Sequence, residues 1–236
     1  MRNKLLMFSG GPDSTAAAYL LRESTDLSLL TLRDATGAKN VGETFAAETI
    51  AQMLNLPQKT IDIASLNSLL DDLPNTLLGL GGGNRPGKSV ESLASKTTCV
   101  APGAVEAPLG LQLLHLCAAI YGISHGFNSM VWAVHKDDDT GHEGWIAEYV
   151  TRFNSLMLFT GYTFQIETPF LSVRKADLFK QAAAKGAPLE LSFSCLTRGA
   201  DVHCGKCQGC KEREHAFLLA GISTTTANRR FSKKRA

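Results

Sequence analysis

Residues with the types and spacing needed to bind an anion lie near the amino end of the chain. The apolar run 5–8 passes directly into Ser-Gly-Gly-Pro-Asp-Ser at 9–14, and helix-forming residues follow at 15–21. Gly10 and Gly11 have no Cβ, so their backbone N–H groups can approach a ligand closely. A helix start adds N–H groups without intrahelical partners and the positive end of the helix dipole. This glycine turn, residues 9–14, is therefore a candidate site for an anion such as a phosphate group.

Three polar side chains surround the glycine turn: the hydroxyl groups of Ser9 and Ser14 and the carboxylate of Asp13. The turn contains no Lys, so it is not the G-x-x-x-x-G-K-[ST] phosphate loop. A plainer interpretation is a glycine-rich turn whose helix is capped by Asp13 or Ser14. The position of the whole motif directly after a strand-like run favours the anion site.

A second candidate site lies near the carboxyl end. Four of the six cysteines fall within sixteen residues there: Cys195, Cys204, Cys207 and Cys210. Four thiolates can fill the tetrahedral coordination of Zn²⁺, and a closed four-sulfur set is typical of structural zinc. Free cysteines or an iron–sulfur cluster would explain the same residues, because four thiolates suit both metals. His203 is a further candidate ligand within the same stretch.

A third, acidic group follows the apolar run 129–134. It contains Asp137, Asp138 and Asp139. Mg²⁺ prefers hard oxygen ligands, so carboxylates at the end of a strand are candidates for a magnesium site. A solvated loop explains the same residues equally well.

The segment 79–98 is rich in glycine, and its residues 82–89 match the letters of a Walker A loop that would use Lys88. No β-branched strand leads into it. Pro86 stands where the loop should donate a backbone N–H to phosphate, and proline has none. We therefore interpret this segment as a mobile flap over the site.

The elements that must position these groups can be read from periodicity and from turn residues. Strands are predicted at 5–8, 27–32, 58–63, 129–134 and 164–170, and helices at 15–21, 41–54, 108–121, 145–158, 176–185 and between Cys210 and Gly221. The alternation of strands and helices predicts a parallel sheet with helices on both faces. Ligands of such sheets bind at the carboxyl ends of the strands, where the glycine turn would lie.

Composition limits the class of protein. The chain has 236 residues, 44% of them hydrophobic, and a net charge of +2, so it can bury a core and gives no general case for nucleic-acid binding. No apolar stretch reaches the length of a membrane span, and no secretory signal is evident. We expect a cytoplasmic protein. We expect a nucleotide-binding domain at 1–190, a cysteine segment at 191–222 and a basic tail at 223–236.

Motifs at both ends of the chain support a resemblance to a known family. The glycine turn resembles the SGGxDS loop of the PP-loop ATP pyrophosphatase superfamily. Together with the cysteine spacing and the K-x-R-x-x-A-F-x-x-A-G segment at 211–221, it resembles the 7-cyano-7-deazaguanine synthase family of queuosine precursor synthesis. Further matches are Pro169-Phe170-Leu171 with Lys175-Ala176, and Ala133-Val134 with Asp138, Thr140-Gly141 and Glu148.

The resemblance implies a doubly wound parallel α/β sheet and an ATP-dependent C–N ligase. It implies ATP contacts from Ser9, Gly10, Gly11, Asp13, Ser14 and Asp138, catalytic roles for Asp13 and Lys175, and zinc on Cys195, Cys204, Cys207 and Cys210. The expected cofactors are ATP, Mg²⁺ and Zn²⁺. The expected substrate is 7-carboxy-7-deazaguanine, which ATP would adenylate and ammonia would convert to the amide and then the nitrile. A homodimer is also expected.

Departures from the family pattern leave the acceptor of the activated carboxylate open. The stretches 33–38, 101–105 and 141–146 differ from family motifs that shape the substrate pocket. The chain could therefore transfer the activated carboxylate to an amine of a protein or another acceptor. The sequence also allows a PP-loop enzyme that modifies tRNA, a non-catalytic zinc-binding module or a Walker-type kinase.

Overall fold

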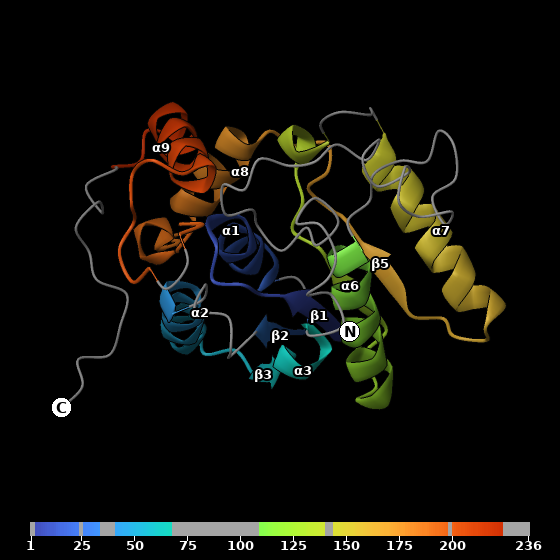
Figure 1. The fold of residues 1–236 in the computed structure, drawn as a ribbon. Helices are drawn as coiled ribbons and strands as arrows, with labels where there is room; N and C mark the ends of the chain where they lie inside the picture. The colour runs from blue at the N-terminus through green and yellow to red at the C-terminus, as the bar shows by residue number, and fades with distance from the viewer. Residues whose placement is uncertain are drawn as a thin grey trace, which may run out of the picture.

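A five-stranded parallel sheet forms the centre of the molecule, with the strand order β3-β2-β1-β4-β5 (Figure 1). The computed structural model describes residues 3–23, 26–33, 41–67, 109–139, 144–197 and 200–223. The strands are β1 (Asn3–Met7), β2 (Asp26–Arg33), β3 (Gln58–Asp62), β4 (Ser129–Val131) and β5 (Gln165–Glu167). Every described pairing between neighbouring strands is parallel.

Helices connect the strands. They are α1 (Pro12–Leu21), α2 (Val41–Leu54), α3 (Ala64–Asn67), α6 (Leu109–Ser124), α7 (Trp145–Phe159), α8 (Lys175–Ala184) and α9 (Gln208–Ala220). Two 3-10 turns, η2 (Lys136–Asp138) and η3 (Leu189–Leu191), lie after β4 and after α8. Among the described residues, no helix is long and apolar enough to cross a membrane.

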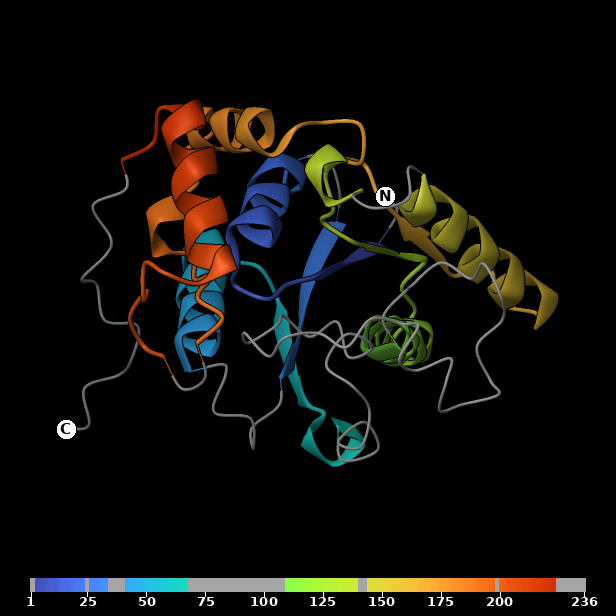
Figure 2. The ribbon, with the colours of Figure 1, turned by 45° about the horizontal axis from the view of Figure 1, so that its top comes forward.

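Helices cover both faces of the sheet, which gives two hydrophobic cores (Figure 2). The side chains of β1 enter the two cores in turn, because successive strand residues point to opposite faces of the sheet. Leu6 belongs to the core under α1, α2, α8 and α9, whereas Leu5 belongs to the core under α6 and α7. The sheet is therefore buried on both faces, which explains the almost continuous apolar runs of β1 and β2.

The strand order places a topological switch point between β1 and β4. The chain leaves β1 towards β2 on one side, and β4 joins the opposite side of β1. Crevices at the carboxyl ends of strands on either side of such a point are the usual ligand sites of open α/β sheets. The glycine turn follows β1 and the acidic group follows β4, so both lie at this edge.

The predicted fold class and the alternation of strands and helices are confirmed. Three strands are shorter than predicted: β3 ends at Asp62, β4 ends at Val131 and β5 covers only Gln165–Glu167. The last parallel pairs of β4 are Leu6 with Val131 and Val131 with Glu167. The predicted flap at 79–98 and the tail from residue 224 lie outside the described residues.

Candidate active site and cysteine cluster

The glycine turn joins β1 to α1 in a conformation that requires glycine. Gly10 has a φ of +79°, a region that L side chains rarely adopt. A Cβ on Gly10 would lie 2.5 Å from the backbone nitrogen of Ala47 and 2.6 Å from the carbonyl oxygen of Glu43. The first turns of α2 therefore press directly on the glycine turn, and no larger residue fits at this position.

Helix α1 begins without the side-chain cap that the plainer interpretation of the turn required. Its N-cap residue is Gly11, with extended backbone, so neither Asp13 nor Ser14 caps it. The Thr15 hydroxyl donates a hydrogen bond back to the Gly11 carbonyl at 2.8 Å. The hydroxyl oxygens of Ser9 and Ser14 lie 3.3 Å apart, and the Gly11 N–H donates to Ser9 Oγ at 3.2 Å. Hydroxyl groups and backbone donors thus share one side of the turn.

Asp13 lies at the centre of a charged group built from three elements. His135 Nε2, from the segment after β4, is 3.2 Å from Asp13 Oδ1. Lys175 Nζ, from the first turn of α8, is 3.3 Å from Asp13 Oδ2. The other ring nitrogen of His135 lies 3.3 Å from Asp138 Oδ2. The structure therefore brings together Asp13, Asp138 and Lys175, which lie far apart in the sequence.

Electrostatics keep Asp13 and Lys175 ionised. Burial alone would raise the pKa of Asp13, but the charge of Lys175 and contacts with His135 outweigh it, and the pKa is lowered. Burial alone would lower the pKa of Lys175, but Asp13 and Asp138 attract its charge, and the pKa is raised. Burial is the main cause that raises the pKa of Asp138. The site thus holds a fixed cation beside a fixed carboxylate.

The three acidic residues after β4 have different partners. Asp137 Oδ2 accepts the backbone N–H of Lys175 at 2.8 Å and so orients the start of α8. Asp139 Oδ2 accepts the backbone N–H of Gly144 at 2.8 Å, directly before α7. Asp138 accepts the backbone N–H of His135 at 2.9 Å and faces the His135 ring. Of the three, only Asp138 belongs to the charged group around Asp13, His135 and Lys175.

His135 was not predicted as a site residue. Its side chain is buried, and both ring nitrogens face carboxylate oxygens. The available signal was a pair of polar residues, His135 and Lys136, between an apolar strand and an acidic run. That pattern does not indicate a partner, because Asp13 lies 122 positions earlier in the chain.

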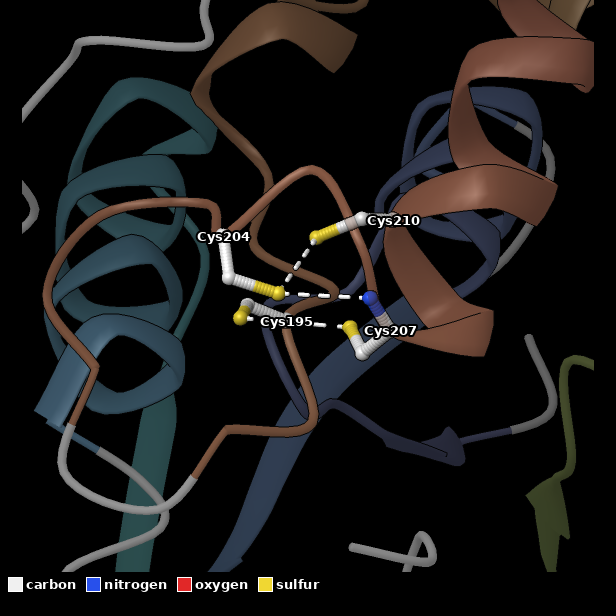
Figure 3. Close-up of side chains that lie close together, drawn as sticks. All are labelled: Cys195, Cys204, Cys207 and Cys210. Carbon is white, nitrogen blue, oxygen red and sulfur yellow. Dashed lines mark hydrogen bonds between the residues drawn. The ribbon is translucent and has the colours of Figure 1, made fainter. Parts of the chain in front are cut away.

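The four cysteines form a compact cluster (Figure 3). Their sulfur atoms lie within 4.8 Å of one another. Cys204 and Cys210 are 4.0 Å apart, as are Cys195 and Cys207. A tetrahedral ion with metal–sulfur bonds of about 2.3 Å sets its sulfurs about 3.8 Å apart, so the cluster fits a metal.

Local hydrogen bonds favour the thiolate of Cys204, whereas burial disfavours that of Cys210. Contacts from Thr197 and from backbone N–H groups lower the pKa of Cys204 to about 6, even though partial burial opposes this. Burial raises the pKa of Cys210, so its thiolate depends on a nearby cation. His203 is outside the metal group; its Nε2 accepts the backbone N–H of Ser194 at 3.3 Å.

Comparison with known proteins identifies the family. The model of the queuosine biosynthesis protein QueC family matches residues 3–221. The chain belongs to the QueC family. The matched QueC region begins with β1 and ends directly after α9, so it contains both the glycine turn and the cysteine cluster.

Two relatives match this chain over more than nine-tenths of their own length. The 7-cyano-7-deazaguanine synthase of Methanothrix thermoacetophila is 29% identical over 232 residues, which are 96% of this chain and 98% of the relative. The 7-cyano-7-deazaguanine synthase of Caldicellulosiruptor bescii is 26% identical over 219 residues, covering 92% and 93%. Among solved structures, the U34-tRNA thiolase NcsA of Methanococcus maripaludis, with its [4Fe-4S] cluster, has a TM-score of 0.52. It is 16% identical and covers 94% of this chain and 75% of its own, a likeness of fold alone.

We predict that His135→Phe destabilises this QueC family member by about 1–3 kcal/mol, because the carboxylates of Asp13 and Asp138 lose a buried partner. Urea unfolding followed by circular dichroism measures the change. His125→Phe is the control, since His125 is exposed. Equal stability of the two variants would contradict the role given to His135.

We predict that Cys204→Ser reduces the metal content of the purified protein by more than half, because a hydroxyl replaces a thiolate ligand. Mass spectrometry of the digested protein measures zinc and iron together. Cys117→Ser is the control, because Cys117 lies outside the cluster. An unchanged metal content in Cys204→Ser would show that the four sulfurs do not hold the ion.

Proposed function

We propose that this protein is a 7-cyano-7-deazaguanine synthase, which uses ATP and ammonia to convert the carboxylate of 7-carboxy-7-deazaguanine into a nitrile. The observation that carries the proposal is the QueC family match over residues 3–221, with relatives of that name covering more than nine-tenths of the chain. The charged group of Asp13, Asp138 and Lys175 at the switch point supports the proposal, because carboxylate activation needs a cation beside the phosphates and carboxylates that can bind Mg²⁺. The enzyme would act in the cytoplasm, and the expected homodimer stays a prediction.

The first step makes a poor electrophile reactive. The substrate carboxylate attacks the α-phosphorus of ATP, the bond to pyrophosphate breaks, and a mixed anhydride with AMP forms. Negative charge grows on the departing pyrophosphate. The N–H groups of the glycine turn and the amino end of α1 would stabilise that charge, and the ammonium group of Lys175 would add a cation.

The next steps form the nitrile. Ammonia attacks the carbonyl carbon of the anhydride, AMP leaves, and one proton is lost to give the amide. The amide oxygen then attacks the α-phosphorus of a second ATP and pyrophosphate leaves; loss of AMP and of the two nitrogen-bound protons forms the triple bond. The chain's contribution is to hold the phosphates in the same place for both activations, which the rigid glycine turn suits.

Two metals fit the residues present. Mg²⁺ would be held by Asp13 with Asp138, whose oxygens suit a hard cation, and would neutralise phosphate charge when bound. Zn²⁺ would be held by the four cysteines as a structural ion, because the four sulfurs leave no position open for chemistry.

The reaction itself tests the proposal. The purified protein is incubated with 7-carboxy-7-deazaguanine, ATP, Mg²⁺ and ammonium, and the products are measured by mass spectrometry. We expect the nitrile, with two AMP for each nitrile formed. ATP cleavage that depends on the acid, without nitrile, would indicate another amine as the acceptor. The absence of any acid-dependent AMP would refute the proposal.

We predict that Asp13→Asn lowers kcat/KM by about a hundredfold or more, because an amide no longer offers the negative charge that holds the Lys175 ammonium group and that would bind Mg²⁺. The readout is the rate of AMP release with the carboxylate substrate. Asp26→Asn is the control, because it makes the same chemical change at an exposed residue that begins β2, at the amino ends of the strands and away from the site. It should leave the rate within twofold of the wild type. A similar rate for both variants would exclude the role of Asp13.

A further inference from the structure

One extended segment links the glycine turn to the cysteine cluster. This strap consists of residues 192–196, Ser-Phe-Ser-Cys-Leu. The backbone N–H of Phe193 donates to the carbonyl oxygen of Gly10 at 2.9 Å. Two residues later, Cys195 contributes its sulfur to the cluster. Phe193 is fully buried, so both contacts belong to the interior of the protein.

Helix α2 presses on the strap and on the glycine turn together. A Cβ on Gly42 would lie 2.5 Å from Cζ of the Phe193 ring, so the ring rests directly against the helix backbone. Five residues later, the backbone of Ala47 comes equally close to Gly10. The Gly10 peptide is therefore held from the α2 side and from the strap side.

The strap is fixed from its other side by the segment that carries the remaining cysteines. A Cβ on Gly209 would lie 2.2 Å from the Ser194 carbonyl oxygen, so the first turn of α9 touches the strap backbone. The backbone N–H of Leu196 donates to Cys207 Sγ at 3.3 Å. Any movement of the Cys207 and α9 region therefore moves the strap.

Arg213 of α9 anchors the first residue of the strap. Its Nη1 donates to Ser192 Oγ at 2.6 Å and its Nη2 to the Leu189 carbonyl oxygen at 3.0 Å. The guanidinium also lies over the Phe217 ring, 4.1 Å from its centroid. Burial lowers the pKa of Arg213 to about 10, so the group is still charged at neutral pH. The amino end of the strap is thus fixed to the same helix that carries Cys210.

The contact with Gly10 determines where the turn points its donors. In a planar trans peptide the C=O and the following N–H point in opposite directions. Phe193 therefore fixes the direction of the Gly11 N–H by holding the Gly10 oxygen. That N–H points to the side of Ser9 Oγ, where the hydroxyl groups of the candidate ATP site lie.

We propose that Phe193 is a positioning residue, through which the metal in the cysteine cluster keeps the glycine turn ordered. Metal binding then favours nucleotide binding, and by thermodynamic linkage the nucleotide slows release of the metal by the same coupling. The identity of the nucleotide rests on the proposed function. The order of the turn does not, because the contacts that carry it involve only the chain itself.

Hydrogen exchange without nucleotide tests the mechanical link. In Phe193→Leu, backbone amides at 9–14 should exchange about tenfold faster than in the metal-loaded wild type, because the turn opens locally more often. Phe164→Leu is the matched control. Phe164 is also buried, and it rests on Gly122 as Phe193 rests on Gly42, but it belongs to the core under α6 and α7.

Metal release and ATP affinity test the coupling. With excess Mg²⁺, ATP should slow transfer of the metal to a colorimetric chelator by about fivefold or more in the wild type, the lower end of usual couplings. Phe193→Leu should remove that effect and raise the Kd of ATP by a similar factor. Phe164→Leu should keep both values within twofold of the wild type.

Each outcome decides between the two ideas. Equal exchange at 9–14 in Phe193→Leu and Phe164→Leu, or metal release that ATP does not affect in a wild type that binds ATP, would overturn the strap proposal. A wild type that binds no ATP would overturn the proposed function, and hydrogen exchange would still decide the strap. If Phe193→Leu does not fold, Gly42→Ala pushes on the same ring from α2 and should loosen the turn in the same way.

Discussion

The charge of Asp13 is the point on which the candidate active site depends. Its two carboxylate oxygens face His135 and Lys175, which come from the segment after β4 and from the start of α8. One side chain therefore joins the turn after β1 to two segments on the other side of the switch point. A carboxylate that is partly removed from water needs such partners, since they offset the cost of desolvating its charge.

Two of the three carboxylates after β4 support the backbone of the site and do not take part in the charged group around Asp13. Asp137 and Asp139 accept backbone N–H groups and so orient the starts of α8 and α7. The Asp137 contact fixes the backbone of Lys175, from which its long flexible side chain extends towards Asp13. The supports of the site are therefore hydrogen bonds from carboxylates to backbone N–H groups near the starts of helices.

The cysteine cluster and the glycine turn form one structural unit although they lie at opposite ends of the chain. The close approaches that join them occur at Gly10, Gly42 and Gly209, where any Cβ would collide with a neighbour. The division at residue 190 stays a prediction. The packing of α9 against α8 and the shared core with Phe179 and Phe217 join the cysteine segment closely to the sheet.

The sequence by itself determined the local features of this protein. Periodicity predicted the order of strands and helices, the glycines predicted the anion turn, and the spacing of cysteines within sixteen residues predicted their cluster, because each signal is contained in one short stretch. Only the tertiary structure decided which distant side chains meet. It paired Asp13 with His135 and Lys175, placed Asp138 against the His135 ring, and set Phe193 against Gly10. Such contacts depend on where loops from separate strands come together, and no pattern along the chain records that distance.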